Sequence, residues 1–410
     1  MKILFLSHYF PPEINAPASR TFEHCREWVK AGHEVTVVTC APNHPRGKVY
    51  DGYRNRLFQR ERREGIEIIR LWTFLSANEG FVLRTLNYVS FMLACILVAP
   101  LLPKTDVVIT TSPQFFNGLA GYFVSRAKRS PWVLEIRDLW PESILAVGAI
   151  RNKLLIKVLR WLEHFAYRKA DRIVPVTDAF AAYMQDSGVP AEKIVVIKNG
   201  VELGLFQRDT SGEAMRARLG LEGKTVAAYF GTHGMAHHLE TVLEAAQILA
   251  KDPRIVFVLV GDGAERSRLL ELKNQQGLSN VLMLDQQPKE AMPELWATAD
   301  ISLVLLRKTD LFKTVIPSKI FEAMGMATPI ILGVEGECRE LVLEAGAGLT
   351  IEPESAVELA AAVRRLADHP DEAKAFGQQG YDYVCVNFDR RVLALRYIDV
   401  LRAAITVKNT

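Results

Sequence analysis

Short apolar runs rich in valine and isoleucine alternate with helix-length segments along the whole chain. These runs cover residues 3–6, 35–39, 66–71, 107–110, 132–136, 173–176 and 194–197 in the first half, and 226–230, 255–260, 281–284, 301–305, 329–332 and 349–351 in the second. Runs this short and this apolar are typical of parallel strands that are buried on both faces. The pattern therefore predicts two doubly wound α/β domains in series.

The boundary between the domains is expected near Asn199-Gly200-Val201, where a turn signal ends the last run of the first half. A polar stretch over residues 207–213 follows it. Ligands of doubly wound folds bind at the carboxyl ends of the strands. We therefore expect the functional site in a cleft that the two Rossmann-like domains face.

Composition agrees with this division and adds an asymmetry of charge. The chain has 410 residues, of which 49% are hydrophobic and 24% charged, so it can bury two cores and is not a disordered polymer. The net charge of +3 conceals 27 Lys+Arg against 18 Asp+Glu in residues 1–200, which leaves 23 against 29 in residues 201–410. The first half, at +9, is the half expected to face an anionic partner.

The cysteines indicate neither a disulfide framework nor a zinc site, because they are scattered and form no Cys-x-x-Cys pair. They are Cys25, Cys40, Cys95, Cys338 and Cys385. The apolar run after Met1 is only four residues long, too short for a signal peptide. These features predict a cytoplasmic location.

Two segments of the first half suggest a membrane surface. Residues 86–102 form an uncharged stretch that contains Pro100 and is short for a bilayer span, so a buried or membrane-dipping helix is expected. Residues 151–169 predict an amphipathic helix with a basic face. A solvated basic face is the alternative, but the charge of this half favours an anionic membrane.

Several familiar motifs fail on inspection. Gly261-Asp262-Gly263 begins a dinucleotide fingerprint, but Arg266 stands in place of the third glycine. No Asp-x-Asp pair is present, and His237-His238 lacks the spacing of metal ligands. We therefore expect neither a metal nor another cofactor. Nucleic-acid binding is also disfavoured, since aromatic residues do not interleave with basic clusters.

The stretch around Lys319 is the most informative. Pro317 and Ser318 predict the start of a helix with Ser318 as its N-cap, which would place free backbone amides beside Lys319 as a cradle for a diphosphate. Glu322, one turn later, can accept hydrogen bonds from a ribose diol. An ordinary capped helix with a surface lysine is the alternative that these residues leave open.

Together these motifs resemble those of a known enzyme family. The motifs are Lys319 to Glu322, the turn at 229–234, the strand end at 258–263, and Asn199-Gly200-Val201. They resemble the retaining, nucleotide-sugar-dependent glycosyltransferases of group 1, which have the GT-B fold. The stretches 9–13, 135–143 and 316–319 resemble the WbuB-like branch, which builds lipid-linked surface polysaccharide in bacteria.

The resemblance implies a role for each domain. Residues 1–200 would bind the acceptor and residues 201–387 the nucleotide sugar, with a C-terminal helix at about 388–410 that can pack back on the first domain. Of the family's paired glutamates the second matches Glu322, and the first falls on Thr314. Thr232 and His237 stand where the wider family commonly has an arginine and a lysine. The other implied donor-binding residues are Gly231, His233, Gly234, Gly261, Gln286, Gln287, Pro317 and Ser318.

On the acceptor side the family's His-Asp pair becomes Arg137-Asp138, so Asp138 is the expected carboxylate there. It could equally pair with Arg137 or cap the following turn. Pro12, Asn15 and Arg20 are the remaining acceptor-side residues. The implied catalytic residues are Asp138, Lys319 and Glu322.

The resemblance therefore implies a membrane-associated enzyme on the inner face. It would transfer a sugar from a UDP-linked donor, as a hexosyl- or N-acetylhexosaminyl-transferase, to a lipid-linked saccharide in surface polysaccharide (O-antigen) biosynthesis. Two alternatives stay open. One is a nucleotide-sugar epimerase of the same fold, and the other is a catalytically silent homologue that acts as a binding subunit.

Overall fold

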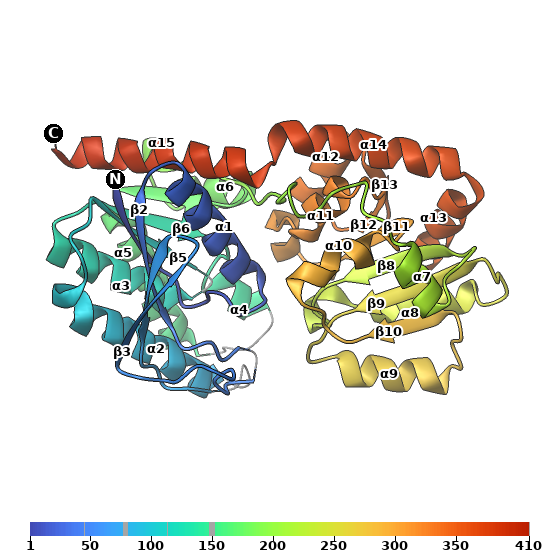
Figure 1. Ribbon diagram of the computed structural model, residues 1–410, viewed down its shortest axis with the longest axis horizontal. Helices are drawn as coiled ribbons and strands as arrows, with labels where there is room; N and C mark the ends of the chain where they lie inside the picture. The colour runs from blue at the N-terminus through green and yellow to red at the C-terminus, as the bar shows by residue number, and fades with distance from the viewer. Residues whose placement is uncertain (45, 77–80, 113, 147–151, 410) are drawn as a thin grey trace. The chain divides into compact units, whose positions relative to one another are not determined.

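The computed structural model describes residues 1–44, 46–76, 81–112, 114–146 and 152–409. The chain forms two compact units, Met1–Lys198 with Arg391–Thr410, and Asn199–Arg390. Each unit contains a sheet of mainly or wholly parallel strands with helices on both faces (Figure 1). The predicted fold class, two doubly wound α/β domains, is confirmed.

The sheet of the first unit has seven strands in the order β3-β4-β2-β1-β5-β6-β7. The strands are β1 (Lys2–Leu6), β2 (Glu34–Cys40), β3 (Phe58–Arg63), β4 (Ile66–Leu71), β5 (Val107–Thr111), β6 (Trp132–Ile136) and β7 (Arg172–Pro175). All neighbours are parallel except β3, which pairs antiparallel with β4 at the edge. β1 lies between β2 and β5, so the carboxyl ends of the central strands meet at one edge of the sheet.

Two helical layers cover this sheet. The helices are α1 (Ala16–Lys30), α2 (Phe81–Val98), the 3₁₀ turn η1 (Ala99–Leu101), α3 (Phe115–Lys128), α4 (Glu142–Ala146), α5 (Lys153–Lys169), α6 (Asp178–Asp186), η2 (Ala191–Lys193) and α15 (Arg390–Asn409). α1 and α15 contribute to the core on one face of the sheet, and α2 and α3 to the core on the other.

The second unit has a six-stranded sheet in the order β10-β9-β8-β11-β12-β13, with every pair parallel. The strands are β8 (Thr225–Phe230), β9 (Ile255–Val260), β10 (Val281–Leu284), β11 (Ile301–Leu305), β12 (Ile330–Gly333) and β13 (Gly348–Thr350). The helices are α7 (Glu213–Leu219), η3 (Met235–His237), α8 (Glu240–Ile248), α9 (Arg266–Gln275), η4 (Lys289–Ala291), α10 (Met292–Trp296), η5 (Leu311–Thr314), α11 (Lys319–Gly325), α12 (Glu337–Glu344), α13 (Ala356–Asp368) and α14 (Pro370–Asn387).

Two of the strand predictions need correction. Residues 194–197 form no strand, because only an isolated bridge joins Ile194 to Ile173 of β7. The edge strand β3 was not predicted, since its sequence FQRERR carries no apolar run. Arg151, the first residue of the predicted amphipathic helix, lies outside the described residues, and α5 begins at Lys153 after a cap by the Asn152 side chain.

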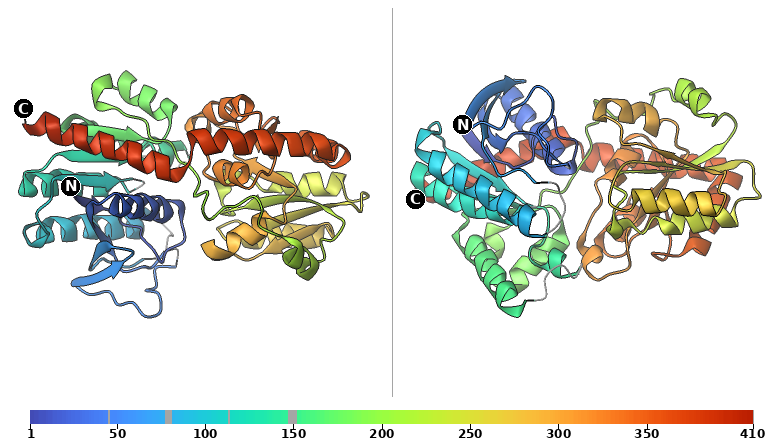
Figure 2. Two further views of the ribbon diagram at one scale, coloured as in Figure 1. Left: turned by 45° about the horizontal axis from the view of Figure 1, so that its top comes forward. Right: turned by 90° about the horizontal axis from the view of Figure 1, so that it is seen from below.

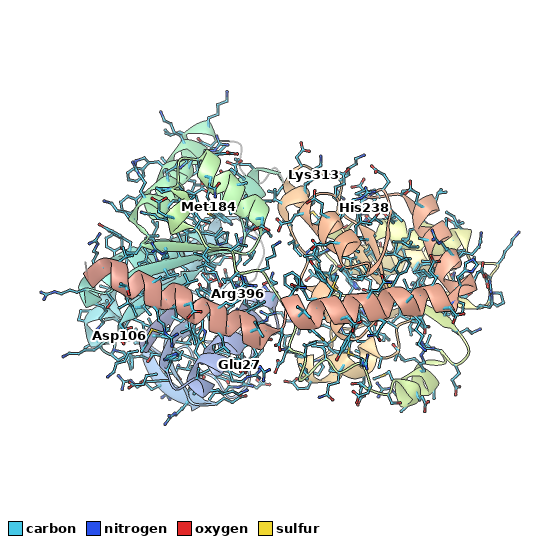
Figure 3. The ribbon with its side chains drawn as sticks, turned by 90° about the horizontal axis from the view of Figure 1, so that it is seen from above. Glu27, Asp106, Met184, His238, Lys313 and Arg396 are labelled. Carbon is cyan, nitrogen blue, oxygen red and sulfur yellow. The ribbon has the colours of Figure 1, made fainter. Side chains whose placement is uncertain are left out.

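The helix at the end of the chain belongs to the first unit. In α15, the side chains of Leu393, Tyr397 and Leu401 are buried in the same hydrophobic core as residues of α1. The Trp28 indole N–H of α1 donates to the Ala394 carbonyl at 2.8 Å. Figures 1 and 3 show the length of α15, with the exposed Arg396 labelled in Figure 3. The last twenty residues thus complete a core whose other members precede residue 200.

Candidate active site

Two glycine turns meet at the carboxyl edge of the sheet in the second unit. Residues 231–234 follow β8 and residues 261–263 follow β9, and these two strands are parallel neighbours. Gly231, Gly261 and Gly263 have φ values of +140°, +155° and +158°, which side chains rarely adopt. A Cβ on Gly261 would overlap the Gly231 carbonyl oxygen, and one on Gly263 would come within 2.5 Å of the His233 oxygen. The turns therefore pack backbone against backbone, and only glycine allows it.

Hydrogen bonds hold the two turns in place. The His233 backbone N–H donates to the Asp262 carbonyl at 2.9 Å, and the Glu265 N–H donates to the His233 carbonyl at 2.9 Å. The Tyr229 hydroxyl at the end of β8 donates to the Thr232 carbonyl at 2.8 Å. The first turn is thus fixed from both sides, which gives the rigid backbone that a ligand site requires.

Lys319, the first residue of α11, brings its ammonium group into this arrangement. The Nζ lies 3.6 Å from the centroid of the Tyr229 ring, is shielded from solvent, and has no hydrogen-bond partner in the part of the chain that the structure describes. A Cβ on Gly231 would lie 2.9 Å from this atom, so the glycine makes room for it. Burial lowers the pKa of Lys319 to about 7, although the nearby Glu322 carboxylate raises it. An anion would supply the partner that the ammonium lacks.

His233 of the first turn and His237, which ends η3, are both neutral. Burial, with smaller contributions from Arg266 and Lys319, lowers the pKa of His233 to about 4, and its ring nitrogens have no partner among the described residues. Burial and then Lys319 lower the pKa of His237 to about 3, and its Nδ1 lies 3.3 Å from the Leu305 carbonyl oxygen. At neutral pH these imidazoles can exchange hydrogen bonds with a ligand but supply no positive charge.

The start of α11 differs from the expected cradle. Ser318 holds the N-cap position, but its side chain makes no capping hydrogen bond. The amides of Ile320 and Phe321 donate to the Pro317 and Ser318 carbonyls at 3.2 and 3.1 Å. The prediction that the first turn offers free amides is therefore wrong for these two groups, because a tight first turn uses them internally. More of the attraction for an anion consequently depends on Lys319.

The other predicted donor-side residues lie in loops and short helices of the same unit. Thr314 ends η5 and donates its hydroxyl to the Leu311 carbonyl at 2.7 Å. Gln286 is exposed after β10, and the Gln287 amide donates to the Asp285 carbonyl at 3.0 Å. Gly234 precedes η3. Glu322 is half-buried one turn beyond Lys319.

Arg266 lies beside the glycine turns, although the sequence did not mark it as a candidate site residue. Its Nε donates to the Gly261 carbonyl at 3.1 Å, and its guanidinium pairs with Asp285 at 2.5 Å. The arginine thus ties the second glycine turn to the loop after β10. The signal that could have marked it is its position in place of the third glycine of the incomplete dinucleotide motif, three residues after Gly263.

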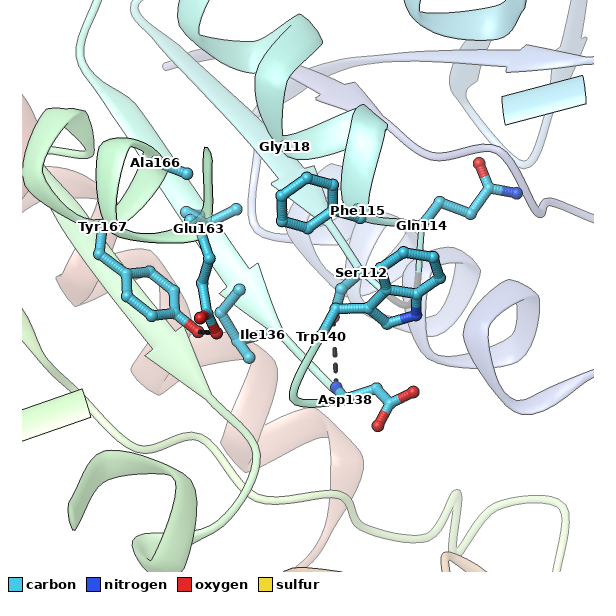
Figure 4. Close-up of a pocket in the computed structure, with 11 residues that line it drawn as sticks. Ser112, Gln114, Phe115, Gly118, Ile136, Asp138, Trp140, Glu163, Ala166 and Tyr167 are labelled. Carbon is cyan, nitrogen blue, oxygen red and sulfur yellow. Dashed lines mark hydrogen bonds between the residues drawn. The ribbon is translucent and has the colours of Figure 1, made fainter. Parts of the chain in front are cut away.

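In the first unit, Asp138 lines a small cavity beside β6 (Figure 4). The cavity offers about 30 Å³ to water-sized molecules, room for about two waters. Ser112 accepts hydrogen bonds from the backbone N–H groups of Arg137 and Asp138 at 2.6 and 3.3 Å, which fixes this turn. Burial raises the pKa of Asp138 to about 6 and outweighs the contributions of Ser143 and Leu139, which lower it.

Glu163 of α5 lines the same cavity and was not predicted. The Tyr167 hydroxyl donates to its Oε1 at 2.9 Å, while Oε2 is buried with no hydrogen-bond partner among the described residues. Burial raises the pKa of Glu163 to about 7. Figure 4 shows that the Asp138 carboxylate points away from the Glu163 and Tyr167 pair. No motif marks Glu163, because in the sequence it is one acidic residue on a basic helix.

Three predicted acceptor-side residues have structural positions. Arg20 is 1% exposed and pairs with Glu135 at 3.1 Å, while its other nitrogens donate to the carbonyls of Ile197 and Lys198. The Asn15 side chain caps α1 by accepting from the Ala18 N–H at 2.9 Å. Pro12 lies in the turn between β1 and α1. The assignment of Arg20 to the acceptor surface is therefore wrong, because the guanidinium is enclosed in the core.

Comparisons with known proteins define the class. The sucrose-phosphate synthase of Thermosynechococcus elongatus matches with a TM-score of 0.77 at 19% identity, over 99% of each chain. Anabaena HepE, solved in complex with UDP and glucose, matches with a TM-score of 0.73 at 18% identity, over 98% of this chain and 99% of that one. The protein thus has the fold of the GT-B glycosyltransferases.

Sequence comparison assigns the protein to a family within this fold. Residues 15–200 match the family described as "Glycosyl transferase 4-like domain", and residues 212–383 match the family described as "Glycosyl transferases group 1". The chain is 27% identical to the putative colanic acid biosynthesis glycosyl transferase WcaI of Escherichia coli K12, over 93% of this chain and 97% of that protein. The protein is a group 1 glycosyltransferase, as the resemblance implied.

Proposed function

We propose that this glycosyltransferase moves a sugar from a UDP-linked donor to a lipid-linked saccharide, in the assembly of a bacterial surface polysaccharide. The observation that carries the donor part is the Lys319 ammonium, which is buried beside the Gly231 turn with no hydrogen-bond partner among the described residues. A diphosphate is the anion that such a site would suit. The names of two similar proteins support the proposal, since HepE binds UDP and WcaI is assigned to colanic acid biosynthesis.

In the proposed reaction, the bond between the anomeric carbon and the diphosphate oxygen breaks, and the acceptor oxygen bonds to that carbon. The growing charge of the leaving diphosphate is stabilised by Lys319 and by the fixed dipoles of the glycine turns. The acceptor proton passes to the departing phosphate on the same face of the sugar. Configuration is then retained without a protein nucleophile, and Glu322 binds the ribose of the donor.

Asp138 is the proposed carboxylate of the acceptor side. With a pKa of about 6 it is mostly ionised at neutral pH, so it can accept a hydrogen bond from an acceptor hydroxyl. It is not required as the base, because the leaving phosphate takes the proton. The proposed reaction also needs no metal, and no group of three His, Cys, Asp or Glu side chains in the described ranges is arranged to hold one.

A screen of sugar nucleotides tests the donor assignment. We expect one UDP-sugar to raise the melting temperature by mass action, and the same compound to release UDP slowly in the absence of acceptor. EDTA should leave this turnover unchanged. Binding without any UDP release would favour the silent binding subunit. Interconversion of the free sugar nucleotide would instead favour the epimerase.

The acceptor and the configuration need a separate measurement. We expect the radiolabelled sugar of the identified donor to enter a lipid extract that contains a saccharide on a lipid diphosphate, and NMR of the product to show the anomeric configuration of the donor. An inverted product would contradict the retaining mechanism alone. A lipid-bound substrate also leads us to propose that the protein works at the cytoplasmic face of the membrane.

A further inference from the structure

Helices α2, α3 and α5 form a single layer on one face of the sheet in the first unit. α3 contacts both α2 and α5, and the Tyr122 ring of α3 lies 5.1 Å from the Phe165 ring of α5. The right panel of Figure 2 shows the layer from its outer side. The apolar segment 86–102 and the predicted basic helix 151–169 are separate in the sequence and each suggested a membrane surface there, and the fold brings α2 and α5 to the same face.

The outer side of this layer exposes many large apolar side chains. Leu97 of α2 is 77% exposed and Leu154 of α5 is 72% exposed. The other exposed apolar side chains of the layer are Val82, Leu83, Leu86, Leu93, Phe123, Leu155, Val158 and Trp161, with Leu101 of η1 beside them. A helical layer that exposes this many large apolar side chains is typical of an interaction site.

The inner side of α2 shows why this helix does not leave the domain to cross a bilayer. By length and composition, Val82–Leu101 could span a membrane, and only 22% of it is buried. Yet Phe91 and Cys95 are fully buried against the sheet. The Asn87 side chain donates to the Phe74 carbonyl at 2.6 Å, and the Phe74 N–H donates to Ser90. The helix is thus held lengthwise on the domain with one apolar side outward.

Basic side chains border the exposed apolar residues. Lys153, Lys157 and Arg168 are exposed on α5, and Arg126 is exposed on α3. A second copy of the chain docked here by twofold symmetry would bring like charges together. An anionic bilayer instead offers hydrocarbon for the apolar side chains and phosphates for the cations. The charge pattern therefore selects a membrane over a dimer.

We propose that the outer sides of α2, α3 and α5 form one docking surface for an anionic bilayer, with the three helices lying in the plane of the headgroups. The inference rests on the proposed function only for its purpose, which is to hold the enzyme beside a lipid-linked acceptor. α2 and α5 act together, so that loss of either helix's outer residues releases the protein.

Flotation with vesicles tests the surface. The full chain is mixed with vesicles of phosphatidylcholine alone or with added phosphatidylglycerol. We expect flotation with the anionic vesicles, weakened by salt. Leu93→Ser with Leu97→Ser, and separately Leu154→Ser with Trp161→Ser, should each reduce binding roughly tenfold or more. Leu343→Ser with Val357→Ser, at exposed positions of the second unit, is the matched control and should float like the wild type.

Three outcomes would overturn the proposal. They are unchanged flotation of either pair of variants, flotation indifferent to phosphatidylglycerol, and a wild-type dimer in light scattering that the α2 variants dissociate. UDP release from the donor is measured in parallel without lipid, and all the variants should retain it. A wild-type protein that floats with the vesicles but releases no UDP would contradict the proposed function and still support the docking surface.

Discussion

The environment of the Nζ atom of Lys319 determines the charge state of this side chain. The motif Pro-Ser-Lys identifies the residue, but the sequence does not reveal that the ammonium lies over the Tyr229 ring without a hydrogen-bond partner in the described ranges. Desolvation penalises the charged form, and the ring and Glu322 compensate only in part. A bound diphosphate would therefore give the Lys319 ammonium the hydrogen-bonding partner that it lacks and would stabilise its charged form.

Removal of either charged group of the donor site should weaken transfer. We expect Lys319→Ala and Glu322→Ala each to raise the barrier in kcat/KM by ~2 kcal/mol or more, about the effect of a lost charged contact. The measurement is UDP release against donor concentration. Lys251→Ala, at an exposed lysine of the same unit, is the control and should leave kcat/KM unchanged. Wild-type values in both site variants would remove this site assignment.

The lowered pKa of Lys319 predicts that UDP binding weakens with rising pH. Only the protonated amine attracts the diphosphate, and the free protein loses that proton as the pH passes about 7. We therefore expect affinity to fall by roughly tenfold per unit between about pH 7.5 and 9. The phosphates are already ionised there, and His233 and His237, with pKa values of about 4 and 3, do not titrate.

Calorimetry in two buffers of different ionisation enthalpy checks this prediction, because binding should take up a proton near pH 8. Lys319→Arg keeps its charge at every pH used, so its affinity for UDP should be nearly flat over the range. A wild-type affinity that is equally flat, with no proton uptake, would show that the ammonium is charged before the ligand arrives.

What the sequence revealed at this scale depended on local pattern. Lys319 and Glu322 lie three residues apart on one helix, so spacing alone brings them together. Arg20 and Glu135 are far apart in the sequence and meet only in the folded domain. There they form a buried ion pair, so Arg20 is not exposed to bind an acceptor as the sequence had suggested. Glu163 shows the converse, because packing against Tyr167 makes an ordinary surface residue of a basic helix into a buried acid.

At the scale of elements, most strands were predictable because parallel strands are continuous apolar runs. β3 escaped because it is an edge strand with both faces largely exposed, so burial does not select apolar residues there. Residues 194–197 are the opposite case, an apolar run that was predicted as a strand but is not one. They run beside β7, with Val195 and Ile197 donating to its carbonyls, but form only an isolated bridge. Apolar composition reports burial and not the hydrogen-bond ladder.

The contact between the two glycine turns predicts a large effect at Gly261. An alanine there would overlap the Gly231 carbonyl oxygen and would have to adopt a φ of +155°. Because Gly231 is itself held by a 3.0 Å bond from its N–H to Val260, the turn cannot easily yield. We expect Gly261→Ala to lower the free energy of unfolding by about 2–4 kcal/mol and UDP affinity by at least roughly tenfold.

Gly277→Ala separates the effect of backbone strain from that of the contact. Gly277 has a φ of +64°, but nothing lies within 4 Å of its added Cβ. This variant should lose only about 1 kcal/mol and bind UDP normally. Urea unfolding and calorimetry measure both quantities. Equal effects at the two glycines would mean that the turns do not depend on close backbone contact.

At the scale of the whole molecule, the order of the chain differs from the order of the cores. The second unit is inserted between residue 198 and the final helix of the first unit. The two units are therefore joined twice, and the first cannot complete its core until the last residues are made. The resemblance implied a C-terminal helix at about 388–410 that can pack back on the first domain, whereas apolar periodicity alone carries no information on which of two sheets a helix covers.

Tyr397 provides the sharpest test of this arrangement. It is fully buried and packs edge-on against Trp28, with ring centroids 5.4 Å apart. Tyr397→Ala should destabilise the first unit by about 3–5 kcal/mol, since a large aromatic side chain leaves a cavity. In scanning calorimetry the transition of that unit should move down by roughly 10 °C, while UDP still raises the transition of the second unit. Leu395→Ala, at an exposed position of the same helix, should shift neither transition measurably. If Tyr397→Ala abolished the response to UDP while both transitions kept their wild-type temperatures, α15 would have to act on the donor site directly and not through the core of the first unit.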